Sequence, residues 1–390
     1  MSASLHNAII QAIRQATGAT GSLPLHAPVF RGNECAYVQD CIETGWVSSV
    51  GSYVDRFERD LAAYTGSAFA VAVVNGTAAL QVALQLAEIR PGDEVIVPSL
   101  TFIATCNAVH YCGAVPHFAD VEWPTLGIDP DKLGEYLSRI ASLKDGACIN
   151  RSTGRPIRGV VPMHTFGHPV RLERLEEVAR TYGLVMIEDA AESLGSFRHG
   201  RHTGTTGITS ALSFNGNKII TTGGGGAILT QDSHIARKAK HLTTTAKIPH
   251  RWRFDHDEIG YNFRLPNLNA ALGCAQLERL PAMLESKRRL AETYRLVFAG
   301  LPGCRFIDEP AGCRSNYWLN AIALDDPSER DSLLETLNNN GLMCRPCWTP
   351  MHLLPMYRDC PSDHLPNTHE IASRLINLPS SADLSAQTHS

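Results

Sequence analysis

The sequence predicts an α/β protein with a large domain built on a mostly parallel sheet and a smaller α+β domain near the C-terminus. Short apolar runs alternate with helix-like stretches from about residue 70 to residue 190, which is the βαβ pattern of parallel sheets. The pattern changes past Gly303, where strand-like and helix-like stretches are fewer and shorter. A chain of 390 residues also exceeds what one hydrophobic core usually organises, so two domains are expected.

The individual elements follow from hydrophobic periodicity and from glycine, proline and asparagine at the breaks. An amphipathic helix is expected within residues 1–18. Strands of the large domain are expected at 70–74, 95–97, 115–118, 157–163, 184–188, 211–214 and 227–230. Helices are expected at 77–88, 103–111, 130–140, 172–182 and 232–243. In the C-terminal part we expect two helices at 268–280 and 283–299, a strand at 318–324, and helices at 329–339 and 370–375.

Lys218 lies between two of these strands, in ALSFNGNKIITTGGGGAILT (211–230). Loops held by rigid strands often carry catalytic groups, and the four glycines at 223–226 allow the backbone to approach a bound group closely. Ser213 supplies a hydroxyl five residues earlier. A lysine in this setting can form a Schiff base with an aldehyde cofactor if its surroundings make it nucleophilic. The alternative is a surface lysine in a glycine-rich hairpin.

Residues 75–78, Asn-Gly-Thr-Ala, join a buried strand to a helix. A helix that begins after a glycine turn presents free backbone N–H groups and the positive end of its dipole, which suits a phosphate. An ordinary capped helix is the alternative interpretation.

Asp189 directly follows the strand LVMIE, and Glu192 follows three residues later. Ligands of parallel sheets collect beyond the carboxyl ends of the strands. A carboxylate at that position can keep a heteroaromatic nitrogen protonated, although it can also cap the next helix. Phe102, at the end of another strand, can stack on a planar ring or fill the core.

The segment 244–267 combines Lys247, Arg251 and Arg253 with two aromatic residues. Cationic and flat apolar groups together can grip a nucleoside diphosphate, and a solvated irregular loop is the alternative.

Composition narrows the class of protein. The net charge of −4 gives no reason to expect nucleic acid, and the N-terminal stretch is neither a signal peptide nor a membrane span. Eleven cysteines without a signal peptide favour reduced thiols in a cytoplasmic protein. The Cys344–Cys347 pair has His352 nearby, but no second pair of ligands follows it, and proline and glycine disrupt the His164–His168 spacing. No metal site is therefore predicted.

Six motifs in order carry a family resemblance across nearly the whole chain. They are GWVSSVGSYVDRFE (45–58), NGTAAL (75–80), GDEVIVPSLTFIAT (92–105), IEDAAESLGS (187–196), SFNGNK (213–218) and GYNFRLPNLNAALGCAQLERL (260–280). The chain resembles the DegT/DnrJ/EryC1/StrS family of nucleotide-sugar aminotransferases, which depend on pyridoxal 5′-phosphate. Its variants MHTFGHPV, LTTTAK and RPCWTPMHLLPMY are most similar to the branch that aminates a UDP-linked 4-keto-6-deoxy-hexosamine on the way to legionaminic-type sugars.

This resemblance implies the aspartate-aminotransferase-like fold type I and a homodimer with active sites at the subunit interface. The implied limits are 1–25 for an N-terminal helix or arm, 26–260 for the large cofactor-binding domain, and 261–390 for interface helices and the small domain.

The resemblance also implies roles for single residues. Lys218 would bind the cofactor and carry protons, Asp189 would pair with the pyridine nitrogen, and Phe102 would stack on the ring. Glu192 would lie beside the ring. The phosphate would be held by Gly76, Thr77, Ala78 and Ser213, together with Asn262 of the second subunit. The substrate side is assigned to Lys247, Arg251, Arg253 and His352, although LTTTAKIPH (242–250) departs from the Arg-Asn-His-Gly-like loop of most relatives and leaves the exact sugar open.

The reaction implied is transfer of an amino group from glutamate to the 4-keto carbon of a nucleotide-linked sugar. Two other functions remain on this fold. Relatives that dehydrate the sugar carry histidine in place of the lysine, which Lys218 argues against. A regulator that binds cofactor or sugar without turnover would be expected to carry a DNA-binding segment, and neither a basic patch nor such a segment is evident.

Overall fold

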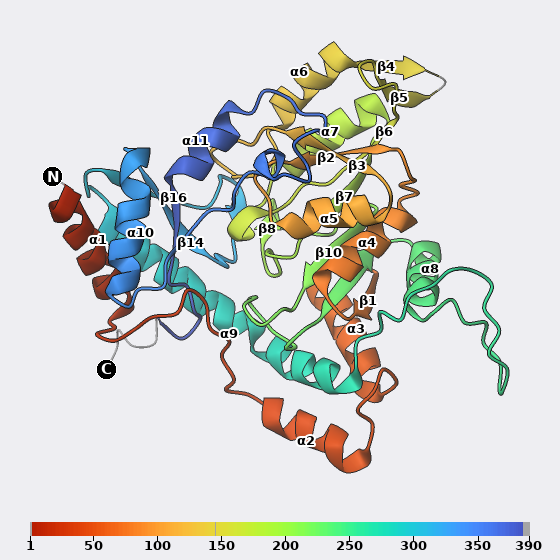
Figure 1. Ribbon diagram of the computed structural model, residues 1–390. Coiled ribbons are helices and arrows are strands. Elements are labelled where there is room, and N and C mark those ends of the chain that lie inside the picture. The colour runs from red at the N-terminus through yellow and green to blue at the C-terminus, as the bar shows by residue number, and fades with distance from the viewer. Residues whose placement is uncertain (1, 145, 385–390) are drawn as a thin grey trace.

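A seven-stranded sheet forms the centre of the large domain in the computed structural model, which describes residues 2–144 and 146–384 (Figure 1). The strand order is β1-β11-β10-β7-β6-β2-β3. β11 pairs antiparallel with β1 and β10, and the other four pairings are parallel. The strands are Phe69–Val73 (β1), Glu94–Pro98 (β2), Val115–Ala119 (β3), Ile157–Val160 (β6), Val185–Asp189 (β7), Thr209–Ser213 (β10) and Gly226–Thr230 (β11). The predicted α/β fold with a mixed, mostly parallel sheet is confirmed.

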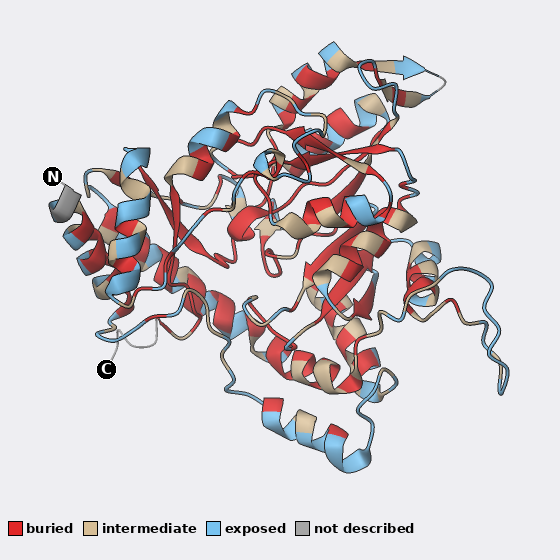
Figure 2. Ribbon diagram, viewed as in Figure 1, coloured by how far each residue is buried: buried red, intermediate tan, exposed pale blue. Residues whose placement is uncertain are grey.

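Helices cover both faces of this sheet because successive strand residues point in opposite directions. Val95 and Val97 of β2 join a hydrophobic cluster with α4, α5 and α8, whereas Ile96 between them joins a cluster with α6 and α7 on the other face. Figure 2 accordingly shows the strands buried and the helices exposed on their outer sides. The helices are α3 (Ser52–Thr65), α4 (Gly76–Leu86), α5 (Ile103–Tyr111), α6 (Pro130–Ile140), α7 (Leu172–Tyr182) and α8 (Ser233–Thr243).

The small domain is built on a four-stranded antiparallel sheet, in the order β12-β14-β16-β15. Its strands are Cys304–Phe306 (β12), Asn320–Leu324 (β14), Arg345–Pro346 (β15) and Leu375–Leu378 (β16). Its helices are α1 (Ser2–Thr17), α10 (Arg330–Asn339) and α11 (Pro366–Arg374). Ile9 and Ile13 of α1 lie in one hydrophobic cluster with Leu333 of α10 and Ile376 of β16. The N-terminal helix therefore packs with the C-terminal part of the chain.

The prediction of two helices at 268–280 and 283–299 is wrong, because one helix, α9, runs from Asn267 to Phe298. Pro281 lies inside it. Proline removes a backbone hydrogen bond and often ends a helix, but packing along both flanks holds this one together. Leu280 lies in a large-domain cluster and Tyr294 in the small-domain cluster, so the same helix belongs to both domains.

Several elements were not predicted from the sequence. They are α2 (Glu34–Thr44), α3, the hairpin of β4 (Ala141–Lys144) and β5 (Ala147–Asn150), the small sheet of β8 (Phe197–Arg198), β9 (Arg201–His202) and β13 (Cys313–Arg314), and the strands β12, β15 and β16 of the small domain. The predicted domain limits stay a prediction, and they include residues 1, 145 and 385–390, which lie outside the described residues. Within the described residues, no helix is long and apolar enough to cross a membrane.

Candidate active site

A cavity of about 620 Å³ opens beyond the carboxyl ends of the central strands, between the two domains. Seven of the residues proposed from the sequence line it together: Gly76, Thr77, Phe102, Asp189, Glu192, Ser213 and Lys218. Asp189 and Ser213 are the last residues of β7 and β10, and the others come from the segments that follow β1, β2, β7 and β10. The small domain closes the cavity with Trp318, Arg345 and Trp348. A ligand at a crossing of strand ends and a second domain is the usual arrangement in α/β proteins.

Lys218 lies in the loop between β10 and β11, as its flanking strands predict. Its Nζ is 3.2 Å from Oε1 of Glu192 and 3.8 Å from the ring centroid of Trp318. The side chain is only 11% exposed. At the end of the glycine run, Gly226 permits close backbone packing: a Cβ there would approach the carbonyl carbon of Asn75 to 2.5 Å.

Asp189 ends β7 and is buried against the floor of the cavity. Burial raises the pKa of its carboxyl, and the hydrogen bond from the Thr105 hydroxyl, at 2.7 Å, opposes this rise. The N–H of Ala191 donates to the other oxygen at 3.2 Å. A buried carboxylate of this kind is stabilised by a cationic partner, and a protonated pyridine nitrogen is such a partner.

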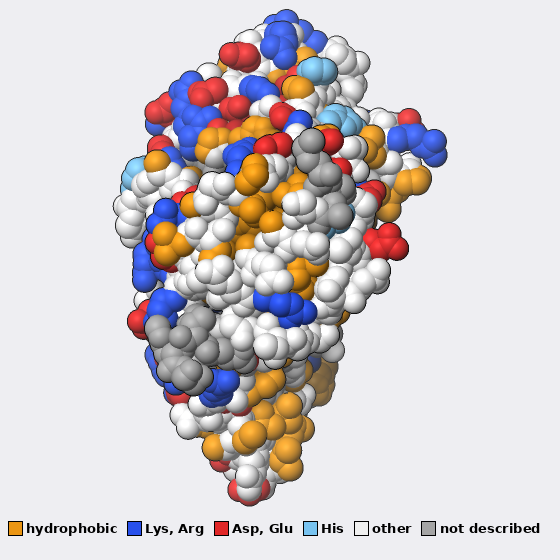
Figure 3. Space-filling view, turned by 90° about the vertical axis from the view of Figure 1, so that its left-hand side faces the viewer, with side chains coloured by type: hydrophobic (Ala, Val, Ile, Leu, Met, Phe, Trp, Pro, Cys, Tyr) orange, Lys and Arg blue, Asp and Glu red, His pale blue; other side chains and the backbone are white. Residues whose placement is uncertain are grey.

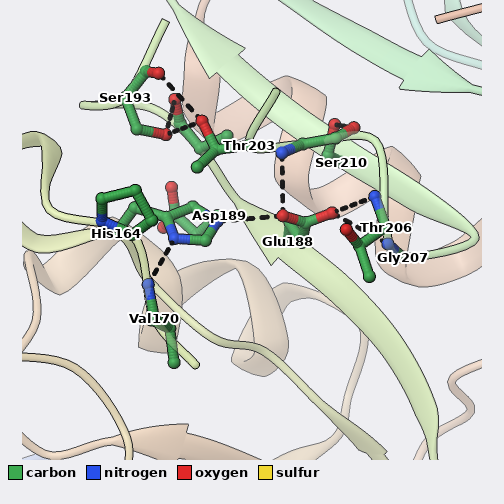
Figure 4. Close-up of polar contacts among 12 residues, drawn as sticks. His164, Val170, Glu188, Asp189, Ser193, Thr203, Thr206, Gly207 and Ser210 are labelled. Carbon is green, nitrogen blue, oxygen red and sulfur yellow. Dashed lines mark hydrogen bonds and ion pairs between the residues drawn. The ribbon is translucent and has the colours of Figure 1, made fainter. Parts of the chain in front are cut away.

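Glu188, the residue before Asp189, holds the carboxyl end of β7 in place through hydrogen bonds (Figure 4). Glu188 accepts hydrogen bonds from the N–H groups of Gly204, Thr206 and Gly207, and His164 Nε2 donates to it at 2.9 Å. Burial alone would raise the pKa of Glu188, but the His164 contact and these N–H groups hold that pKa below its usual value. His164 Nδ1 accepts from the N–H of Val170 at 3.2 Å, so both of its ring nitrogens serve structure. The network fixes where Asp189 stands.

Glu192 is also buried, and its two oxygens have different partners. Oε2 accepts a 3.0 Å hydrogen bond from the N–H of Phe166, and Oε1 contacts Lys218. Burial raises the pKa of Glu192 to about 7, with the charge of Lys218 acting in the opposite direction. Phe166 holds this N–H in place with a left-handed backbone, φ 56°. Glu192 can therefore gain or lose a proton near neutral pH.

The start of α4 has the geometry of an anion-binding cradle. The side chain of Asn75 accepts the N–H of Ala78 at 2.8 Å, which caps the helix and leaves the N–H groups of Gly76 and Thr77 at the cavity. A Cβ on Gly76 would lie 2.8 Å from Cβ of Ser213, so glycine permits this approach of the hydroxyl. N–H groups at a helix start and a serine hydroxyl fit a phosphate. Ala78 was also predicted to hold the phosphate. Its N–H instead donates to the Asn75 side chain that caps the helix, and the residue does not line the cavity.

Comparison with known proteins decides the family. The model of the DegT/DnrJ/EryC1/StrS aminotransferase family matches residues 29–390. The chain belongs to this family. It is 38% identical over 361 residues to GDP-perosamine synthase of Vibrio cholerae, covering 92% of this chain and 94% of that protein. It is 35% identical over 333 residues to the putative pyridoxal phosphate-dependent aminotransferase EpsN of Bacillus subtilis (strain 168), covering 85% and 83%. The crystal structure of DesI in the presence of its TDP-sugar product is similar with a TM-score of 0.80 and 28% identity, covering 93% and 88%.

Membership makes the chain a pyridoxal-phosphate-dependent sugar aminotransferase of fold type I, and the residues in the cavity fit the cofactor. The α4 cradle would hold its phosphate and Asp189 its ring nitrogen, with Lys218 within the same cavity. The roles given to these residues are a proposal that rests on their positions around one cavity.

Five family residues predicted for the site do not line this cavity: Asn262, Lys247, Arg251, Arg253 and His352. Asn262 accepts hydrogen bonds from Arg264, and the three cationic residues belong to a loop that extends from the body (Figure 1). His352 instead contacts the hydroxyl of Ser99 at 2.7 Å and the ring of His369 at 3.2 Å. Contacts with Ser99 of the large domain and His369 of α11 thus occupy both ring nitrogens of His352, and its substrate role stays a prediction.

Four residues of the cavity and its surroundings received no role in the sequence analysis: Thr105, Trp318, Arg345 and Trp348. Of these, only Trp318 lies outside the motifs that carry the resemblance. Trp348 packs on Phe166, with ring centroids 5.2 Å apart, and faces Phe102 at 6.3 Å. The tryptophans come from the small domain, which is more than 100 residues later in sequence than the strand ends. Trp318 has no sequence signal beyond being an aromatic residue close to a predicted strand, and Trp348 lies in RPCWTPMHLLPMY, which carried only the resemblance to one branch of the family.

The cysteine pair belongs to no group of three or more potential metal ligands in the described residues. Cys344 and Cys347 are free and buried on either side of β15, and burial raises the pKa of each thiol to about 12. The one group of potential ligands found in the described residues is His241, Asp257 and Glu258, at the base of the extended loop.

Proposed function

We propose that the enzyme transfers the amino group of glutamate to the 4-keto carbon of a nucleotide-linked 4-keto-6-deoxy sugar. The observation that carries this proposal is one cavity that holds a lysine, a buried carboxylate and an anion cradle together. Pyridoxal phosphate supplies the electron sink that makes the α-proton of an amino acid acidic. The protein has to orient the reactants and move protons.

Each residue has a distinct part in that work. Lys218 Nζ takes the α-proton of glutamate and returns a proton to carbon, since among the described residues it is the one lysine that lines the cavity. Asp189, held by Thr105 and Ala191, keeps a positive charge at the ring nitrogen. Phe102 provides an apolar ring at the cavity wall, and the side chain of Glu192 adjusts the charge beside Lys218.

The sequence motifs favour a UDP-linked N-acetylhexosamine of the legionaminic-type branch, and this is the finer form of the proposal. The relative named GDP-perosamine synthase supports a different nucleotide, GDP. Trp318 and Trp348 give the cavity flat apolar walls, which suit a deoxy sugar ring.

We also propose a homodimer with shared sites and a cytoplasmic location. Asn262 lies outside its own chain's cavity, which leaves it available to a second subunit. Apolar side chains gather at the lower end of the face in Figure 3, where α2 lies in Figure 1. Large exposed apolar residues in and after α2 are Ile42, Trp46, Val47 and Val50. All eleven cysteines are free, as expected in a reducing compartment.

Two measurements test the function. Borohydride reduction followed by peptide mapping should attach the cofactor to Lys218, and an adduct on another lysine would contradict the assignment. Incubation with glutamate and matched UDP-, GDP- and TDP-linked 4-keto-6-deoxy sugars should give an amino sugar and 2-oxoglutarate with one nucleotide preferred. Glutamate turnover without amination of any sugar in the panel would contradict the proposed acceptor.

A further inference from the structure

We propose that Trp318 is a positioning residue for Lys218: its indole face holds the free lysine side chain as an ammonium ion, beside Glu192, between proton transfers. The inference rests on the proposed catalytic role of Lys218. It assigns a function to a small-domain residue that the family motifs do not include.

The geometry is that of a buried cation–π contact. Lys218 Nζ lies 3.8 Å from the Trp318 ring centroid, and Trp318 is only 5% exposed. Tryptophan offers the strongest such attraction of the aromatic side chains, and the attraction grows when water is excluded. Glu192 contacts the same nitrogen at 3.2 Å. The ammonium ion thus has one carboxylate partner and one aromatic partner.

Trp318 is held rigidly in this orientation. Its indole N–H donates a 2.6 Å hydrogen bond to the carbonyl of Asn217, the residue before Lys218. Its backbone N–H donates to Asn316 Oδ1 at 2.7 Å, and its carbonyl accepts from Lys287 Nζ at 3.1 Å. Tyr317, directly before it, has a left-handed backbone with φ 47°, which a non-glycine residue adopts only when its surroundings enforce it. Hydrogen bonds therefore connect the indole of Trp318 to the loop that carries Lys218, and its backbone to α9.

The other titratable groups near Lys218 do not replace this contact. The carboxyls of Asp189 and Glu192 feel the charge of Lys218 from the large-domain side. From the N-terminal segment, His26 is near Lys218 and Lys287. Burial, Lys287 and Lys218 hold the pKa of His26 well below its usual value, so His26 is neutral and adds no charge beside Lys218.

The contact has a chemical consequence: it favours the protonated form of Lys218 in the site. The ring face attracts the charged form and not the neutral amine. After Lys218 has taken a proton, Trp318 therefore keeps it as a donor. In the step that follows, an N–H bond breaks with its electron pair left on nitrogen, and a C–H bond forms with a pair from the acceptor carbon. The proton is conserved, and no further reactant is needed.

Competitive acetylation of the cofactor-free protein tests the contact. A trace of acetic anhydride reacts with the neutral form of a lysine amine and not with the ammonium form, and peptide mass spectrometry compares Lys218 with exposed Lys144 in the same sample. At neutral pH, Trp318→Leu should raise the relative labelling of Lys218 by about two- to thirtyfold, the range expected for losing a cation–π contact. Trp318→Phe keeps a ring face and should stay within about threefold of the wild type.

Trp348→Leu is the matched control, because it also removes a tryptophan from the cavity wall but not the one next to Lys218. If Trp318→Leu and Trp348→Leu raise Lys218 labelling equally, the change is one of access and the inference is wrong. Trp318→Met replaces the leucine variant if circular dichroism shows that the latter does not fold. The labelling needs no turnover, so a wild-type protein that fails to aminate sugars would contradict the proposed function and leave this result standing.

Discussion

The hydroxyl of Thr105 donates a 2.7 Å hydrogen bond to Oδ2 of Asp189, joining the first turns of α5 to the end of β7. Thr105 is completely buried, and Asp189 is 4% exposed. With the N–H of Ala191 on the other oxygen, two donors fix the plane of the carboxylate without neutralising its charge. Orientation and charge can therefore be changed separately.

Asp189→Asn removes the charge and should lower kcat by a factor of about several hundred, because one preorganised electrostatic contact at a catalytic centre is worth about 3–4 kcal/mol. Stability should fall much less. The measurements are kcat at saturating cofactor and thermal unfolding of the same preparation. Near-normal activity would reduce Asp189 to a structural cap.

Thr105→Val keeps the charge of Asp189 and removes the donor that orients it. We expect a smaller loss of activity than in Asp189→Asn, since a hydrogen bond to a charged group is worth about 1.5–3 kcal/mol. Thr105→Ser, which restores the hydroxyl, should recover most of kcat. Equal activity of the valine and serine variants would show that the hydroxyl has no part in orientation.

Lys287 should make stability depend on pH. Burial lowers its pKa from 10.5 to about 7, and its Nζ donates to the carbonyls of Trp318 and Ser380. Between these two values the unfolded chain binds the proton and the folded chain does not, so unfolding free energy rises with pH. The slope from this group is at most about 1.4 kcal/mol per pH unit. Urea titrations from pH 7.5 to 9 should show a shallower rise in Lys287→Met, whereas parallel curves would contradict the lowered pKa.

The extended loop is predicted to contact the sugar nucleotide and not glutamate. Charge reversal of Arg251 and Arg253 together should raise the KM for the sugar and leave the glutamate half-reaction nearly unchanged. Arg253 is 3.6 Å from Asp255 and both side chains are exposed, so little folding energy depends on them. Equal damage to both half-reactions would indicate misfolding, and no damage would remove the loop from the site.

Subunit complementation tests whether Asn262 serves the partner's site. Lys218→Ala and Asn262→Asp homodimers should each be nearly inactive, the latter because a carboxylate repels the cofactor phosphate. In a hybrid dimer, the chain that retains Lys218 receives an intact Asn262 from its partner. Random pairing makes half of the dimers hybrids, so roughly a quarter of wild-type activity should return. If Asn262 serves its own chain, verified hybrids stay inactive.

The sequence alone locates much of the candidate site, because local chemistry marks those positions. A strand end marks Asp189, a strand-flanked glycine loop marks Lys218, and a strand-turn-helix marks Gly76. It does not locate Trp318, which reaches Lys218 through tertiary packing across about 100 residues of sequence. The predicted helix end before Pro281 is wrong for a related reason. The contacts of α9 with two domains outweigh the tendency of proline to end a helix.

The length of α9 has a consequence for dissecting the protein. Cys274 and Leu280 pack with the large domain, while Leu290 and Tyr294 pack with α1 and the small sheet. A fragment ending before Asn267 loses part of the cover of its central sheet, and a fragment beginning after Phe298 loses a wall of its core. Neither half is a self-sufficient module, so transplanting the small domain between relatives would have to carry this helix and the surfaces that it packs against.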